Sequence, residues 1–171
     1  MEVRVVEKDQ MLLVGLSFFG DPFKSSAGWT EENEIGRLWV RFMAFLESQG
    51  ARIQHIKEHE VSYEVHIEHA ETQEKGEYEV FVGLEVEQLQ DVPVELLVKV
   101  LPRTAYAVFT LQGEEITSDW HQMIQRDWLP ESGYRIAYDY AIERYDPRFK
   151  GLDRIAESVL EVYIPVAGAG S

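Results

Sequence analysis

The segment GEEITSDWHQMIQRDWLPESGYRIAYDYAIERYD, residues 113–146, decides the fold because it repeats an arrangement that the chain has already made once. The second half is predicted to hold an extended stretch or strand pair, a helix and two strands, over residues 95–111, 114–128, 138–145 and 158–165. The first half has the same order, over residues 3–18, 34–49, 61–68 and 77–87. A duplicated unit constrains the architecture more firmly than local propensity does.

The two halves also match in residue detail. The matching features are Trp39 and Trp120 inside the helices, YEV at 63–65 and YAI at 140–142, and EVFVG at 79–83 and EVYIP at 161–165. We therefore predict an α+β fold in which two strand-helix-strand-strand modules form an antiparallel sheet with pseudo-two-fold symmetry. Clefts between packed units are favoured places for small-ligand sites.

The domain organisation follows from the duplication. We expect a single domain over 1–166, with halves over about 1–90 and 91–166. The small, glycine-rich segment 167–171 is expected to be a flexible tail.

Apolar residues recur at three- and four-residue spacing in both predicted helices. In the first helix they are Ile35, Leu38, Trp39, Phe42, Phe45 and Leu46, and in the second Ile116, Trp120, Met123, Ile124 and Trp128. Gly50 ends the first helix, and the second is expected to stop at Leu129, because Pro130 disfavours helical geometry in the residue before it. We expect both helices to cover one face of the sheet and a ligand cleft to occupy the other.

Composition limits the classes of function. The chain of 171 residues is 45% hydrophobic, enough for one core. Its 16 Lys and Arg against 31 Asp and Glu give a net charge of −15, which disfavours contact with nucleic-acid phosphates. There is no cysteine, no apolar run of membrane-spanning length and no secretory signal pattern. We expect a cytoplasmic protein with neither membrane nor direct nucleic-acid partners, although such acidity is also an ordinary means to solubility.

Several apparent motifs are expected to carry no chemistry. His55 to His59 spell HxxEH, but this zinc-ligand pattern needs a helix, and here it directly precedes a strand. His66 and His69 lack a third ligand at metal-site spacing. No phosphate-binding glycine loop and no GxSxG elbow occurs. We expect no metal and no cofactor.

An aromatic and carboxylate cluster in the second half remains. It comprises Tyr134, Tyr138, Tyr140, Glu143, Tyr145, Glu161 and Tyr163. Strand alternation puts Glu143 and Tyr145 on one face, and Tyr140 and Arg144 on the other. A carboxylate among apolar walls is costly to bury unless it is paired or receives a cation, so Glu143 is a candidate functional residue. The alternative is a surface salt bridge from Glu143 to Arg144, Arg135 or Arg148.

Residues 113–146, followed by LEVYIPV at 160–166, resemble the second half of the GyrI-like small-molecule-binding domain. That domain also forms the effector-binding part of multidrug-sensing transcription regulators. The resemblance rests on Trp120, WLPESGY at 128–134, the glutamate of IERYD and the closing strand. VVEKDQMLLVG at 5–15 and YEVFVGLEV at 78–86 agree with it in the first half, so that it covers essentially the whole chain.

The resemblance implies a ligand cleft between the two halves, with the family's pocket glutamate at Glu143. It further implies aromatic ligand contacts, which are Tyr145 and Tyr163 in matching motifs, the helix residue Trp120, and Trp39, Phe18, Tyr106 and Phe81 by position alone. Regulators of this kind carry a helix-turn-helix region ahead of the domain, whereas this chain starts at the domain's first strand. The resemblance thus implies a stand-alone member.

Three functions follow as hypotheses. The first is a binding protein for bulky aromatic, often cationic small molecules. The second is a hydrolase that opens strained, cyclopropane-type rings, in which Glu143 acts as general base and Tyr145 donates to the developing oxyanion. The third is an acidic protein-interaction module. The residues leave the oligomeric state open.

Overall fold

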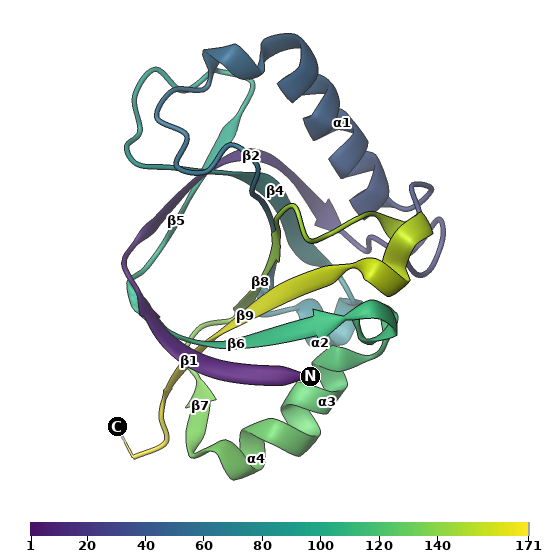
Figure 1. Cartoon of the computed structure of the whole chain (residues 1–171), viewed down its shortest axis with the longest axis vertical. Helices are drawn as coiled ribbons and strands as arrows, with labels where there is room; N and C mark the ends of the chain where they lie inside the picture. Colours follow the sequence, from purple (N-terminus) through teal and green to yellow (C-terminus); the bar gives the residue numbers. More distant parts are fainter. Residues whose placement is uncertain (171) are drawn as a thin grey trace.

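The structure of the protein is a computed structural model that describes residues 1–170 (Figure 1). The strands of the first half are β1 (Glu2–Lys8), β2 (Met11–Gly20), β3 (Ser62–Ile67) and β4 (Tyr78–Val86). Those of the second half are β5 (Leu97–Leu101), β6 (Thr104–Gln112), β7 (Tyr134–Ile136), β8 (Tyr140–Tyr145) and β9 (Val159–Gly168). Within the described residues these nine strands form one antiparallel sheet.

The strand order shows the internal symmetry. It is β1-β6-β9-β8-β3-β4-β2-β5, which reads as two equivalent four-strand halves that meet between β8 and β3. Each half lends its first strand to the other, because β1 pairs with β6 and β5 pairs with β2. The prediction of an α+β fold with duplicated modules and an antiparallel sheet is confirmed. Residues 3–18 are not one strand, however, because the chain leaves the sheet at Asp9 and Gln10 so that β1 and β2 can pair at opposite ends.

The first helix lies where it was predicted. Helix α1 covers Glu34–Gln49, begins at the N-cap Asn33 and ends at Gly50, with Leu38 and Phe42 buried. The shorter helical segments outside the second helical region are η1 (Gly50–Arg52), α2 (Thr72–Lys75) and η4 (Leu152–Glu157).

The second predicted helix is wrong in its continuity and its end. The region is broken into η2 (Gly113–Thr117), α3 (Trp120–Met123), the π-helical η3 (Ile124–Trp128) and α4 (Leu129–Ser132). Asp119 starts a new helix, because its side chain accepts the Gln122 N–H at 3.2 Å. Pro130 does not end the helical region, since it lies in the first turn of α4, where its missing N–H removes no helical hydrogen bond. Gly133, at φ 74°, ends the region instead.

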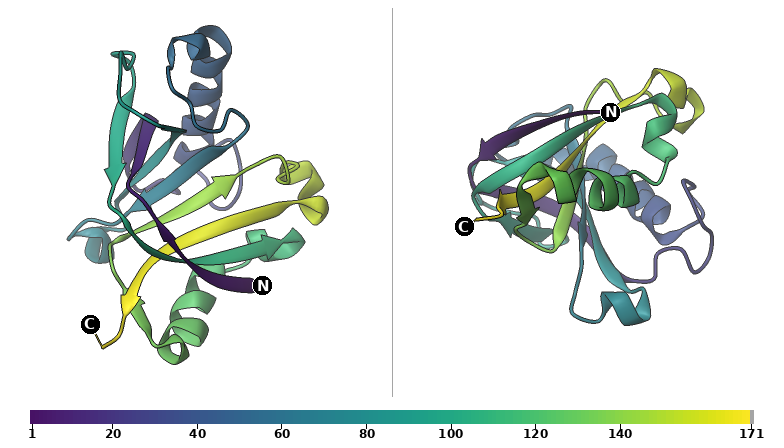
Figure 2. Two further views of the ribbon diagram at one scale, coloured as in Figure 1. Left: turned by 60° about the vertical axis from the view of Figure 1, so that its left-hand side comes forward. Right: turned by 90° about the horizontal axis from the view of Figure 1, so that it is seen from below.

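The sheet curls around an apolar cluster on one of its faces. Strands near both ends of the order contribute to this cluster, Val6 from β1 and Leu101 from β5, so the sheet must bend round it. The other face carries the helices: α1 packs over β2 and β4, α3 packs beside β6 and β9, and α4 lies next to β7 (Figures 1 and 2). Both helices therefore cover one face, as predicted.

Two smaller points concern the chain's edges. Strand β9 continues through Ala167 and Gly168, which pair with β7, so these two residues of the expected tail lie in the sheet. The end of that predicted tail, Ser171, lies outside the described residues. None of the helices within residues 1–170 has the length and apolar character needed to cross a membrane.

Candidate functional site

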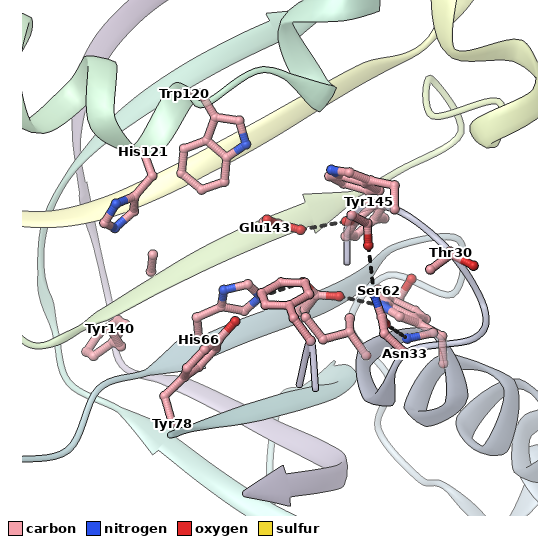
Figure 3. A pocket seen from close by; sticks show the side chains of 18 of the residues that line it. Thr30, Asn33, Ser62, His66, Tyr78, Trp120, His121, Tyr140, Glu143 and Tyr145 are labelled. Atoms are coloured by element: carbon pink, nitrogen blue, oxygen red, sulfur yellow. Dashed lines mark hydrogen bonds and ion pairs between the residues drawn. The ribbon is translucent and has the colours of Figure 1, made fainter. Parts of the chain in front are cut away.

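A cavity of about 1560 Å³ lies between α1 and α3, on the face of the sheet that carries the helices. Strands β3 and β8 form its floor, and the loop before α1 borders one side (Figure 3). The prediction that the cleft lies on the face opposite the helices is therefore wrong. The physical reason is that the curled sheet fills that other face with its own apolar side chains.

Two carboxylates face each other at the centre of the floor. Glu64 of β3 and Glu143 of β8 are direct partners in the antiparallel register, and each is only 4% exposed. Two residues further along each strand, on the same face, are His66 and Tyr145. The pseudo-two-fold symmetry thus places a Glu-x-His pair in one half opposite a Glu-x-Tyr pair in the other.

The two carboxylates differ in the number of hydrogen bonds that they accept from neighbouring side chains. Glu64 accepts the indole Nε1–H of Trp39 at 2.6 Å on Oε1, and its Oε2 lies 2.6 Å from Nε2 of His66. Glu143 accepts the Tyr145 hydroxyl on Oε2 at 2.6 Å. Both oxygens of Glu64 are therefore bound to donors within β3 and α1, whereas Glu143 has one such donor.

The pKa values of the two carboxyl groups differ accordingly, with that of Glu143 raised and that of Glu64 lowered. Burial and the charge of Glu64 raise the pKa of Glu143 to about 8. Burial opposes ionisation of Glu64 too, but the bonds and charge of His66 and the bond from Trp39 outweigh it and hold that pKa below its usual value. Burial also opposes the protonation of His66, yet its bond and charge interaction with Glu64 raise its pKa to about 9. At neutral pH the floor holds ionised Glu64, imidazolium His66 and protonated Glu143.

The donor atoms of Glu64, His66 and Glu143 lie within 4.8 Å of one another, a spacing that would suit a metal ion. Each of the three groups already has a hydrogen-bond partner among its neighbours. We therefore treat them as a hydrogen-bonded acid-base cluster rather than as metal ligands.

The loop beside the cavity is fixed to α1 by local interactions. The Asn33 side chain accepts the Gly36 N–H at 2.9 Å and donates to the Gly28 carbonyl at 2.7 Å. A Cβ on Gly36 would lie 2.2 Å from the Thr30 carbonyl oxygen, so only glycine lets the loop approach this closely. The loop residues Trp29 and Thr30 consequently border the cavity.

The family model described as "Cass2: Integron-associated effector binding protein" matches residues 4–166. The chain belongs to this integron-associated effector-binding family. It is also 32% identical, over 169 residues, to the transcriptional regulator BrlR of Pseudomonas aeruginosa. That match covers 97% of this chain and 56% of BrlR, so the chain spans about half the length of this relative.

Two solved structures share the fold of this effector-binding family member. One is SAV2435 bound to tetraphenylphosphonium, with a TM-score of 0.64, 15% identity, and coverage of 98% of this chain and 95% of that one. The other is EcmrR in a complex with DNA, with a TM-score of 0.66, 14% identity, and coverage of 98% and 57%. At these identities the likeness concerns the fold alone.

Four residues expected at the site of the effector-binding domain lie around the cavity: Trp39, Trp120, Glu143 and Tyr145. Trp39 and Tyr145 are in edge-to-face contact, with ring centroids 5.2 Å apart. Two of the three arginines considered as partners of Glu143 pair elsewhere, since Arg144 and Arg148 pair with Asp146 and Glu161.

The other four expected residues do not line the cavity. Tyr106, Tyr163 and Phe81 belong to the apolar cluster on the opposite face of the sheet. There Tyr106 bonds the Tyr140 hydroxyl at 2.7 Å, and Tyr163 donates to Glu161 at 3.1 Å. Phe18 lies on the helix-bearing face but packs into the cluster under α1. The first three, which the family resemblance suggested, thus lie on the face opposite the cavity, and strand alternation separates two faces without saying which of them is open.

Sequence reasoning missed Glu64 and set His66 aside. It matched YEV at 63–65 to YAI at 140–142, which put Ala141 rather than Glu143 opposite Glu64 in the comparison of the halves. The symmetric arrangement around the β3–β8 pair instead relates Glu64 to Glu143 and His66 to Tyr145. A shift of two residues keeps side chains on the same face, so alternation alone could not reveal the error.

Proposed function

We propose that the protein is a cytoplasmic binding protein for bulky, aromatic, cationic small molecules, which enter the cavity between α1 and α3. The observation that carries this proposal is the pair of buried carboxylates on a floor surrounded by aromatic rings. Aromatic faces attract cations, and each such contact contributes about 0.5–2 kcal/mol. We assign ligand contacts to Glu143, Tyr145, Trp39 and Trp120.

The charge of the cavity supports the same ligand class. No lysine or arginine is among the described residues that line it. The acidic residues that line it are Glu31, Glu47, Glu60, Glu64, Glu68, Asp119, Asp139, Glu143 and Asp146. Such an arrangement attracts cations and repels anions. The same net charge of −15 supports the absence of direct DNA binding by these residues.

The direct test compares two ligands of the same shape and opposite charge. Tetraphenylphosphonium should bind saturably at neutral pH, whereas tetraphenylborate should not, because it would bring a second negative charge to Glu64. Isothermal titration calorimetry of both ligands against the whole chain measures the difference. Equal affinities would remove charge recognition from the proposal.

We propose ring-opening hydrolysis as a second candidate, because two neighbouring carboxyl groups with separated pKa values suit acid-base chemistry. With the proton on Glu143, that residue would act first as the acid instead of the base expected from the sequence. Incubation with a strained cyclopropane electrophile should then give ring-opened product in excess over protein. Product no greater than one equivalent would leave binding as the function.

A further inference from the structure

We propose that the same cavity binds a second class of ligand, bulky uncharged molecules with a strong hydrogen-bond acceptor, and that the carboxyl group of Glu143 donates the hydrogen bond that holds them. The inference deepens the proposed cation-binding function and rests on it, since both ligand classes share one cavity. Glu143 then changes its protonation state with the ligand. It is a protonated acid when a neutral ligand is bound and an anion when a cation is bound.

The geometry of the floor requires a proton there when the cavity is empty. Glu64 and Glu143 are in direct register on neighbouring strands, both almost fully buried. Two carboxylates this close repel each other when both are ionised, and burial adds to the penalty. His66 is the one basic side chain in the cluster, and it can balance only one of the two charges. A proton held by one carboxyl group relieves the remaining charge.

That proton belongs on Glu143. Both oxygens of Glu64 already accept bonds from Trp39 and His66, so Glu64 is the better stabilised anion. Among the described residues Tyr145 donates to Oε2 of Glu143, which leaves Oε1 able to carry a proton. In the empty cavity this proton is shared with the neighbouring Glu64 carboxylate, and a neutral ligand with a strong acceptor takes the place of Glu64 in that hydrogen bond. The raised pKa of Glu143, to about 8, agrees with this assignment.

Titratable side chains near Glu143 come from the strands of the floor and from α3 on the other side of the cavity. The strands contribute Glu64, His66, Tyr78 and Tyr145. On the side of α3, His121 and Asp119 line the same cavity, and Figure 3 shows His121 beside Trp120. Helix α1 contributes Trp39, which carries no charge. Burial and Glu64 favour the proton on Glu143, while His66 and the Tyr145 bond favour its loss. A cation that enters beside Glu143 also favours loss of the proton, so its binding leaves Glu143 ionised.

The two ligand classes should therefore depend on pH in opposite directions. A cation binds the ionised form of Glu143, so its affinity should rise by up to about tenfold per pH unit below pH 8 and level off above it. A neutral acceptor binds the protonated form. Its affinity should be full below pH 8 and fall by up to about tenfold per unit above it.

The experiment titrates tetraphenylphosphonium and triphenylphosphine oxide, a neutral phenyl-bearing molecule with a strong P=O acceptor, from about pH 6 to about pH 9. The phosphonium affinity should rise up to about pH 8 and then level off, and the phosphine oxide affinity should stay level up to about pH 8 and then fall. In Glu143→Gln the amide donates a hydrogen bond at every pH, so the phosphine oxide should still bind and its pH profile should be flat. Glu161→Gln, which changes a buried carboxylate on the opposite face, should leave both slopes as in the wild type.

The outcomes separate this inference from the proposed function. If the phosphonium binds and the phosphine oxide does not bind at any pH, the inference is wrong and the cation-binding function stands. Parallel pH profiles for the two ligands, or slopes that persist in Glu143→Gln, would also overturn it. If the phosphonium fails to bind while the phosphine oxide binds with the expected slope, the cation-binding function fails instead.

Discussion

Replacement of Glu143 by glutamine should weaken tetraphenylphosphonium binding by about five- to two-hundred-fold, which corresponds to about 1–3 kcal/mol. The amide keeps the size of the carboxyl group and its ability to bond the Tyr145 hydroxyl, but it cannot become an anion. The variant therefore loses the charge that a bound cation would pair with, and nothing else in the contact surface changes. Calorimetric titration above pH 8, where the wild-type carboxyl is ionised, gives the clearest difference.

The same variant should keep its stability or gain slightly. In the empty protein Glu143 is protonated at neutral pH, and a glutamine amide resembles that neutral form. Thermal melts of wild type and variant without ligand measure this directly. A loss of stability together with unchanged cation affinity would make Glu143 a structural residue and contradict the site.

Glu161→Gln provides the matched control. Glu161 is also buried, but it lies on the opposite face of the sheet, where it pairs with Arg4 at 2.8 Å and with Arg144 and Arg148 at 3.6 and 3.4 Å. Its replacement removes the ion pair of Arg4, while Arg144 and Arg148 keep their pairs with Asp146, so stability should fall while cation affinity stays within error of the wild type. The two variants should thus show opposite patterns in the same pair of assays.

The sequence predicted an element correctly where its pattern of residues is compatible with a single structure. The apolar stripe through Leu38 and Phe42, with Gly50 after it, predicts α1 to the residue. The second helix was harder, because Asp119 restarts the helix and a π-turn follows it. Neither feature changes the spacing of the apolar residues, so the periodicity predicts one continuous helix across both of them.

The faces of the central strands could not be predicted for a similar reason. Strands β4, β6 and β9 are buried on both faces along most of their length. Alternation is informative only when one face meets water. The family resemblance suggested Tyr106 and Tyr163 as ligand contacts although they face the apolar cluster, whereas Glu143, which was suggested by its motif, lines the cavity. Glu64 became visible only when strand register brought it opposite Glu143.

Replacement of His66 by glutamine should cost about 3 kcal/mol of unfolding free energy near pH 6, the lower end of the range for breaking a buried ion pair. We take the lower end because the His66 side chain is 28% exposed, while that of Glu64 is 5% exposed. The variant leaves Glu64 with the Trp39 bond but without a positive partner. Glutamine retains a donor, so the expected loss comes from charge rather than from an unmade hydrogen bond.

His69→Gln is the control for this variant. His69 is three residues further on, 49% exposed on its side chain, and 3.9 Å from Glu79. An exposed pair at that distance contributes little, so the unfolding free energy should change by less than about 0.5 kcal/mol. Urea denaturation of both variants and the wild type gives the comparison.

The pH dependence of the His66→Gln effect distinguishes an ion pair from simple packing. The folded pKa of His66 is raised from 6.5 to about 9, so its contribution is complete below pH 6.5 and is lost as pH rises through 9. The folded pKa of Glu64 is lowered from 4.5, so its contribution is complete above pH 4.5 and is lost as pH falls through the folded value. The cost of the variant should therefore be greatest between these limits, near pH 5 to 6, and shrink on both sides. A cost that stays constant from about pH 4 to about pH 9 would mean that His66 acts by packing, and the charge assignment of the floor would then be wrong.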